Sequence, residues 1–393
     1  MTYRRRITPT ERLYLAAREV APPFLMHLVV HGSGAIDPAR LQRAVDLASA
    51  ANPGARLVRD GAHWIDSGVA ARVRVVAEHT LTYPELEADP VLGSPIEPTA
   101  DRTCEVLLLT ADPVTVVFRV FHGVMDGMGA RLWVDDVFRA LRGEDPLGAP
   151  DPVADADLVA RLGAPGTPTR LLPVHRSAAG HGRQDPARRA LLRHRTVAGG
   201  GKGVVARIAA ALADAAGRPS RIMIPVDLRR HDPRLRSTAN LALPLFVDVA
   251  PGDGGQRVTA AMRAGLAARR ELAEMDNGGL TAFPPAVVRG ALRAGNLLGA
   301  RTGRNLVSAT VSHMGTVDLA ALTAPGFTPT TMRILPQHSG IMPLLFGILE
   351  TPAGLEITVS CRNGAGVEAR LEALLDRIAA ALEGDHTGAG TGH

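Results

Sequence analysis

The chain has 393 residues, of which 46% are hydrophobic and 21% are charged, a balance that excludes an intrinsically disordered protein. Its formal net charge of +5 favours an acidic partner, such as nucleic acid, coenzyme A or an acidic carrier domain. Because only 3% of the residues are aromatic and the basic residues are scattered, nucleic acid is the weakest of these three candidates.

At the N-terminus, the run Arg4-Arg5-Arg6 predicts a solvated tail. The segment that follows it, ITPTERLYLAAREV, carries four charged residues and cannot form the apolar core of a signal peptide. No stretch of about eighteen uncharged apolar residues occurs elsewhere, so no membrane span is expected. Cys104 and Cys361 lie in strand-like apolar runs without metal-binding spacing. Both are predicted to be core residues of a reduced, cytoplasmic protein.

The first half of the chain alternates strand-like runs with two helical patterns. A helix is predicted with Asp37 as its N-cap and Pro38 in its first turn, and it stops before Asn52. A second helix is predicted at 129–142, with Asp135 and Asp136 on a solvated face. The predicted strands are 25–31, 69–79, 103–110 and 114–121.

From Gly143 to about Gly203 the composition changes to Pro, Gly, Asp and Arg with weak periodicity, which predicts a connection between two halves. The second half has predicted helices at 204–216, 256–275, 284–299 and 366–383 and predicted strands at 220–226, 241–249, 304–312, 341–349 and 354–361. Residues 384–393 are predicted to be a disordered tail. Strands and helices mixed in both halves predict an α/β or α+β protein of two lobes, with a site in the cleft between them.

The segment FRVFHGVMDGMGA at 118–130 has the strongest candidate chemistry. His122 ends an apolar strand, Asp126 follows four residues later, and Gly127 and Gly129 come next. Glycines behind a strand end leave room for a substrate to approach the imidazole, and a nearby Asp can hold the local geometry through an ion pair. From these residues alone, a structural histidine and a catalytic one remain equally open. A zinc site on His122 and Asp126 has no third ligand placed by spacing, so no metal is expected.

This stretch resembles the H-H-x-x-x-D-G motif shared by chloramphenicol acetyltransferase, the condensation domains of nonribosomal peptide synthetases, and polyketide-associated and plant acyltransferases. The segments VVARIAAALADAAG and RIMIPVDLRRH, within 204–231, look like the helix and strand that end in this family's Pro-Val-x-x-Arg type turn. Asn240-Leu241 is similar to its Gly-Asn-x element, and VSATVSHMGTVDL (307–319) to its Ser-Asn-x-Gly strand end. The matches occur in the family's order over nearly the whole chain.

The resemblance implies the chloramphenicol-acetyltransferase-like fold, in which each lobe is a mixed sheet flanked by helices and a tunnel runs between the lobes. On this reading residues 1–170 form the N-terminal lobe, 171–203 the inter-lobe connection and 204–393 the C-terminal lobe. His122 then acts as the general base that deprotonates a hydroxyl or amine acceptor as it attacks an acyl thioester.

The resemblance also implies roles for the neighbours of His122. Asp126 points away from the substrate and pairs with Arg229, while Gly127 leaves space in the tunnel. Ser312 is a candidate donor to the tetrahedral oxyanion. No covalent acyl-enzyme and no tightly bound cofactor are needed.

Three departures from the family pattern narrow the prediction. Phe121 stands where the family has the first histidine of its pair, and His313 replaces an Asn in the third element, which alters the tunnel. The D-F-G-W-G type motif of the plant branch is absent, so that branch is not expected.

The expected protein is a stand-alone, monomeric acyltransferase of secondary metabolism that acts on a small-molecule acceptor. An acyl-coenzyme A donor is favoured by the positive charge and by the absence of a fused carrier module; Arg183, Arg188 and Arg189 are candidate contacts for its phosphates. Two alternatives stay open. One is a condensation enzyme that takes phosphopantetheinyl thioesters from an acyl or peptidyl carrier protein, and the other is a catalytically silent scaffold.

The remaining candidates have weaker patterns. The sequence AGGGKG at 198–203 suggests a phosphate loop, but no strand is predicted before it and Gly203 replaces the Ser or Thr that should follow Lys202, so a flexible linker is expected. The other histidines considered are expected at the surface or in a loop: His175, His181, His194 and His338.

Overall fold

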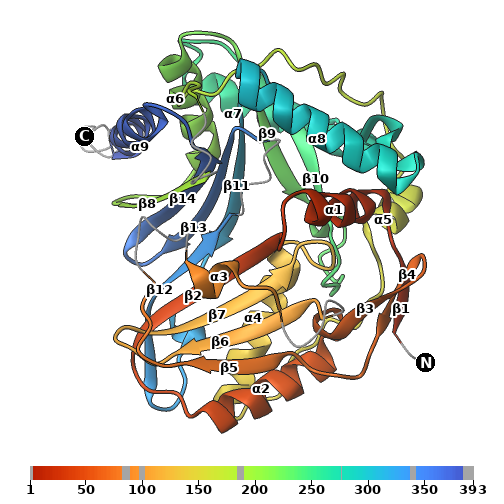
Figure 1. Ribbon diagram of the computed structural model, residues 1–393, viewed down its shortest axis with the longest axis vertical. Helices are drawn as coiled ribbons and strands as arrows, with labels where there is room; N and C mark the ends of the chain where they lie inside the picture. Colours follow the sequence, from red (N-terminus) through yellow and green to blue (C-terminus); the bar gives the residue numbers. More distant parts are fainter. Residues whose placement is uncertain are drawn as a thin grey trace, which may run out of the picture.

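The computed structural model describes residues 3–81, 89–96, 102–183, 190–275, 277–336 and 342–383. The chain forms two lobes, one above the other in Figure 1, and each lobe is built on a mixed sheet that helices cover. This is the two-lobe α/β architecture that the sequence predicts. The predicted tail at 384–393 and His338 lie outside the described residues.

The N-terminal lobe is built on a five-stranded sheet of order β12-β2-β7-β6-β5. Its strands are β2 (Leu25–Gly34), β5 (Arg72–Val76), β6 (Cys104–Leu109), β7 (Val114–Phe121) and β12 (Phe327–Leu335). The helices α2 (Pro38–Ala51) and α4 (Gly127–Leu141) cover one face and share a core with it. The predicted N-cap of α2 is confirmed, since the Asp37 carboxylate accepts a hydrogen bond from the Arg40 backbone N–H at 2.7 Å.

The C-terminal lobe is built on a six-stranded sheet of order β10-β9-β11-β13-β14-β8. Its strands are β8 (Ala190–Val197), β9 (Ser220–Asp227), β10 (Ala242–Val249), β11 (Ala309–Thr316), β13 (Leu344–Thr351) and β14 (Gly354–Arg362). The helices of this lobe are α6 (Val204–Ala216), α7 (Gly254–Ala267), α8 (Pro285–Thr302) and α9 (Val367–Glu383). Helices α6 and α9 pack on the outer sheet face, whose apolar residues include Val311, Phe346, Val359 and Cys361. The prediction that Cys104 and Cys361 are core residues is confirmed.

Smaller elements complete the fold. They are the strands β1 (Arg4–Arg6), β3 (Leu57–Asp60) and β4 (His63–Asp66) and the helices α1 (Pro9–Val20), α3 (Pro90–Gly93) and α5 (Asp155–Leu162). Strand β1 pairs with β4, and Arg5 is only 5% exposed, so the prediction of a solvated tail is wrong. Arg5 is buried because the Glu11 carboxylate compensates its charge at 2.5 Å.

Two strands connect the lobes differently from the predicted order. Strand β8 lies within the predicted connection, yet it pairs antiparallel with β14 at the edge of the C-terminal sheet. Its apolar period is interrupted by Arg193 and Arg195, whose charges pair with Glu372 of α9. Strand β12 comes from the second half of the chain but extends the N-terminal sheet beside β2 (Figure 1). It contains four threonines and a proline, and this composition hides its strand character.

A buried polar cluster joins the two sheets where β12 crosses β14. The Glu356 carboxylate of β14 accepts hydrogen bonds from Thr331 at 2.8 Å and Arg333 at 3.0 Å, both on β12. His194 of β8 lies 2.5 Å from the same carboxylate, so the prediction that His194 is a surface residue is wrong. Burial raises the pKa of Glu356, but His194, Arg333 and Thr331 together lower it to about 2. The carboxylate is therefore ionised at all but strongly acidic pH.

Replacing this carboxylate should weaken the protein in a pH-dependent way. The folded-state pKa lies below the ordinary value, so the stabilisation is present above about pH 4.5 and is lost as the pH falls toward about 2. Glu356→Gln should lower the free energy of unfolding by about 1–3 kcal/mol at pH 7 and by much less at pH 3, as measured by urea denaturation at both pH values. An equal loss at both pH values would show that the cluster does not depend on this charge.

Candidate functional site

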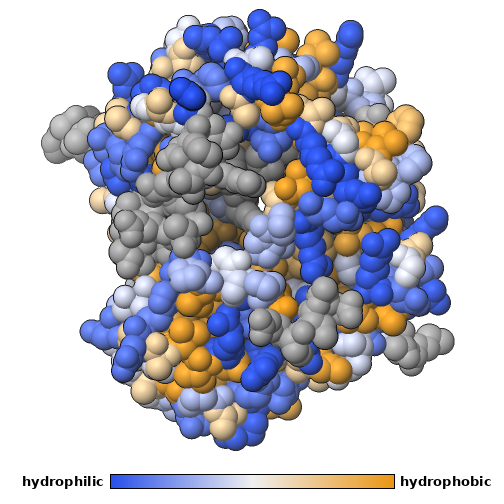
Figure 2. Space-filling view, in the orientation of Figure 1, coloured by the Kyte–Doolittle hydropathy of each residue, from blue (hydrophilic) through white to orange (hydrophobic). Residues whose placement is uncertain are grey.

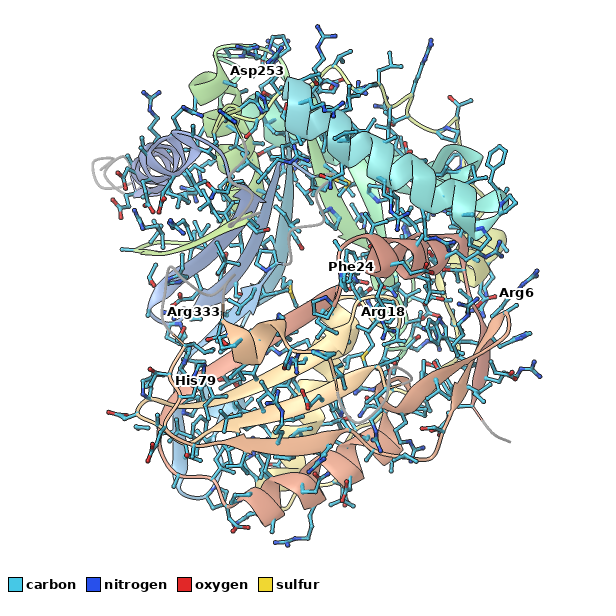
Figure 3. The ribbon with its side chains drawn as sticks, viewed as in Figure 1. Arg6, Arg18, Phe24, His79, Asp253 and Arg333 are labelled. Atoms are coloured by element: carbon cyan, nitrogen blue, oxygen red, sulfur yellow. The ribbon has the colours of Figure 1, made fainter. Side chains whose placement is uncertain are left out.

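The His122 motif lies where β7 ends and α4 begins, at the junction of the two lobes. His122 directly follows the last residue of β7, and Asp126 is the N-cap of α4. The space-filling view shows a hollow between the lobes (Figure 2). Phe24, whose ring centroid lies 6.5 Å from that of His122, marks the position of the imidazole at this junction in Figure 3.

His122 is partly buried, and its environment favours the neutral imidazole. Burial lowers the pKa of His122, and the backbones of His122 and Met125, the Asp126 carboxylate and the Asn240 side chain oppose this shift only in part. The Nδ1 atom is buried and has no hydrogen-bond partner among the described residues. Nε2 is therefore the nitrogen that can meet a substrate, and at neutral pH it is free to accept a proton.

Asp126 is held entirely by protein groups. It is 3% exposed, and its carboxylate accepts hydrogen bonds from the backbone N–H groups of Gly129 at 2.6 Å and Leu241 at 2.7 Å. The Arg229 guanidinium adds two more, at 3.1 and 3.2 Å. With this many donors the carboxylate has a structural role, because it caps α4 and holds a cation from the other half of the chain.

Arg229 ties a turn of the C-terminal half to the motif. Besides Asp126, its guanidinium donates to the carbonyl oxygens of Ser237 at 2.9 Å and Ala239 at 3.0 Å and to Asp227 at 2.8 Å. Residues more than a hundred positions apart in the sequence thus meet in one buried network. The network fixes the start of α4 and, through it, the loop that carries His122.

The glycines of the motif allow close packing on this turn. A Cβ atom at Gly129 would lie 2.2 Å from the carbonyl oxygen of Thr238, so only glycine permits this contact between α4 and the C-terminal half. At Gly127 the position of a Cβ lies 2.8 Å from the sulfur of Met314. The space predicted beside Gly127 is therefore occupied by a flexible methionine side chain.

Ser312 and His313 lie on opposite faces of β11, because side chains alternate along a strand. Ser312 shares its face with Met314, which contacts the Gly127 position, so Ser312 is on the side of the motif. His313 points toward Glu350, with its Nε2 3.4 Å from the carboxylate, and burial lowers its pKa. The two residues predicted together at the tunnel are thus separated by the sheet.

Sequence reasoning missed the contribution of the N-terminal segment. Arg5 donates a hydrogen bond to the carbonyl oxygen of Val124, inside the motif loop, at 2.9 Å. Its partner Glu11 is fully buried and also accepts from the Thr8 backbone at 3.1 Å and from the Trp64 indole at 3.1 Å. The signal was present as the capping box T-x-x-E of residues 8–11, which marks the start of α1.

Several other candidates have changed roles. Asp136 is 1% exposed and accepts hydrogen bonds from Asn52 and from the backbone of Leu147 and Gly148, so its predicted place on a solvated face is wrong. His181 is exposed and His175 is partly buried. Of the arginines suggested for phosphate binding, Arg183 is exposed, and positions 188 and 189 lie outside the described residues.

The glycine-rich segment at 198–203 follows β8 directly and precedes α6, so the expectation that no strand comes before it is wrong. Lys202 and Gly203 line a groove of about 980 Å³ that α6, α7 and α9 form. This groove is on the outer side of the C-terminal sheet, away from the motif. It is a feature separate from the candidate site.

Two searches for other functions returned nothing within the described ranges. No three His, Cys, Asp or Glu side chains come together there in a way that could hold a metal ion. Among the helices of the same ranges, none combines the length and the apolar character needed to cross a bilayer.

Comparison with known proteins shows the fold. No family model and no curated protein matches the chain. Three solved structures match it over nearly their full length. The first condensation domain of the CDA synthetase is 17% identical, with 96% of this chain and 96% of that chain covered and a TM-score of 0.63. Polyketide synthase associated protein 5 from Mycobacterium tuberculosis is 14% identical, with 96% and 97% covered and a TM-score of 0.63.

The third structure is a mutant of the starter condensation domain of the rhizomide synthetase RzmA in complex with C8-CoA. It is 16% identical, with 97% of this chain and 95% of that chain covered and a TM-score of 0.60. Together these likenesses show that the chain has the two-lobe fold of condensation domains and of the polyketide-associated protein, as the motif resemblance implied.

Proposed function

We propose that this protein is an acyltransferase that moves an acyl group from a thioester to a hydroxyl or amine acceptor, with His122 as the general base. The observation that carries the proposal is the environment of His122. A neutral imidazole stands at a strand end between the lobes, with Nδ1 buried and its loop fixed by the Asp126–Arg229 pair. The fold shared with condensation domains supports the same reaction class.

The chemistry needs only proton transfer and charge stabilisation. As the acceptor oxygen or nitrogen forms a bond to the thioester carbonyl carbon, His122 Nε2 takes the acceptor's proton. The Ser312 hydroxyl donates a hydrogen bond to the resulting oxyanion. When the tetrahedral intermediate collapses, the carbon–sulfur bond breaks and the imidazolium returns the proton to the leaving thiolate. No covalent acyl-enzyme forms.

A second candidate is a condensation enzyme whose donor or acceptor is attached to a carrier protein. The fold likeness to condensation domains favours it. A silent scaffold is less well supported, because His122, Asp126 and Arg229 are all present and Asp126 and Arg229 contact each other. The two enzymes differ in the donor that they accept.

We predict that the donor is an acyl-coenzyme A. The net charge of +5 attracts a ligand that bears three phosphates, and a structure of the same fold was determined with C8-CoA bound. The purified protein should saturate with free acyl-coenzyme A at micromolar to millimolar concentration, measured as release of free thiol in the presence of an acceptor. If only an acyl group loaded on a carrier protein gives product, the condensation enzyme replaces this proposal.

A further inference from the structure

We propose that Tyr14 of α1 is a positioning residue for His122: its ring stacks on the imidazole, fixes its orientation and stabilises the imidazolium that forms during acyl transfer. The inference rests on the proposed role of His122 as the base. It assigns part of the site to the N-terminal segment, which the motif resemblance did not implicate.

The contact is a direct ring stack. The centroids of Tyr14 and His122 lie 4.5 Å apart and the two rings are inclined by 27°. Phe24 lies nearby, with its ring centroid 5.9 Å from Tyr14 and 6.5 Å from His122. The imidazole therefore meets an aromatic face rather than a polar partner on this side.

Helix α1 is held firmly enough to position a ring. Thr8 and Glu11 form a capping box at its start, and the same Glu11 carboxylate binds Arg5 and the Trp64 indole. Arg5 in turn donates to the Val124 carbonyl in the His122 loop. Helix α8 packs along α1 on the other side (Figure 1). Tyr14 and His122 are thus parts of one connected structure, and their relative position is fixed from both ends.

The stack matters most when His122 carries charge. The face of an aromatic ring bears partial negative charge and attracts a cation placed over it. The other groups that face the imidazole are Asp126 of α4, Asn240, Phe24 and the backbone of the motif loop. Nδ1 has no hydrogen-bond partner in the described part of the chain, so no acceptor there stabilises the imidazolium N–H directly. Burial raises the pKa of the Tyr14 phenol, so Tyr14 stays neutral and acts through its ring.

Two substitutions separate the ring from the rest of the side chain. Tyr14→Phe keeps the aromatic face and should leave kcat within about threefold of the original value. Tyr14→Leu keeps apolar bulk without the face and should lower kcat by roughly 10- to 30-fold, with KM changed by less than threefold. In the leucine variant the acid limb of the pH–rate profile should move to lower pH, because the imidazolium is less stable and the pKa of His122 falls.

A fluorinated series provides the matched control for folding. Phenylalanine at position 14 with one, three or five ring fluorines keeps the shape of the ring while it removes the negative charge of the face. The pKa of His122, followed by NMR of the labelled imidazole in wild-type and variant proteins, should fall stepwise along the series. A flat series, or a leucine variant that matches the phenylalanine variant, would overturn the role of Tyr14.

The NMR readout does not depend on turnover, so it also separates this inference from the proposed function. If the His122→Ala variant remains active, His122 is not the base and the proposed function fails. A stepwise fall of the His122 pKa would still establish the stack in that case.

Discussion

Replacing His122 by alanine is expected to lower turnover by about two to four orders of magnitude, the usual contribution of a general base. The imidazole is the only titratable group of the motif that is both neutral and free of a polar partner at Nδ1 among the described residues. Asp126 cannot replace it, because its oxygens are held by Arg229, Gly129 and Leu241. The rate of thiol release under saturating donor and acceptor measures the effect.

The fold should survive this change, since His122 makes no printed hydrogen bond to another element and only its ring contacts are lost. The thermal midpoint and the circular dichroism spectrum should stay close to those of the original protein. His181→Ala, at an exposed loop position, is the matched control and should leave turnover unchanged. Near-normal activity in a folded His122→Ala variant would remove the central claim of the proposed function.

The Asp126–Arg229 pair should have the largest effect on stability. Removing either partner leaves a buried charge without compensation, which typically costs about 3–5 kcal/mol. Asp126→Ala should be the more severe of the two, because it also leaves the backbone N–H groups of Gly129 and Leu241 without their acceptor. The double variant should cost much less than the sum of the single variants, since it strands neither charge. Urea denaturation of the four proteins gives this double-mutant cycle.

Helix α4 contains its own control for this cycle. Arg131 and Asp135 form an i,i+4 ion pair at 2.6 Å on the same helix, but the Asp135 side chain is 39% exposed. Solvent screens such a pair, so its coupling should stay below about 1 kcal/mol. Coupling of the same small size for Asp126 and Arg229, or simple additivity of their single effects, would contradict the buried pair as the link between the two halves.

The elements that sequence reasoning located correctly are those with a strong local signal. The predicted helix after Asp37 and the strand ending at His122 are found as α2 and β7, because capping residues and apolar periodicity act within a few residues of the chain. Strands β8 and β12 were missed for the opposite reason. Their charged and hydroxyl side chains find partners on distant elements, such as Glu372 for Arg195 and Glu356 for Thr331. Periodicity reads these residues as exposed.

Charges near the site show the same limit. Arg5 and Asp136 look solvated in the sequence, since isolated charged residues usually are. Each is buried here only because a partner far along the chain compensates it: Val124 and Glu11 for Arg5, and Asn52 for Asp136. The order of residues contains no record of such pairings unless a motif resemblance supplies them, as it did for Asp126 and Arg229.

The sequence by itself therefore determined the two-lobe class of the fold and the place of His122 between a buried strand and a capped helix. Both follow from local patterning and from one short motif. Only the tertiary structure decided what surrounds the imidazole: the Tyr14 ring, the Arg5 clamp on the loop, and the opposite facing of Ser312 and His313. These depend on how α1, β1 and β11 pack against the motif, and packing between distant segments is set by shape and charge compensation in three dimensions.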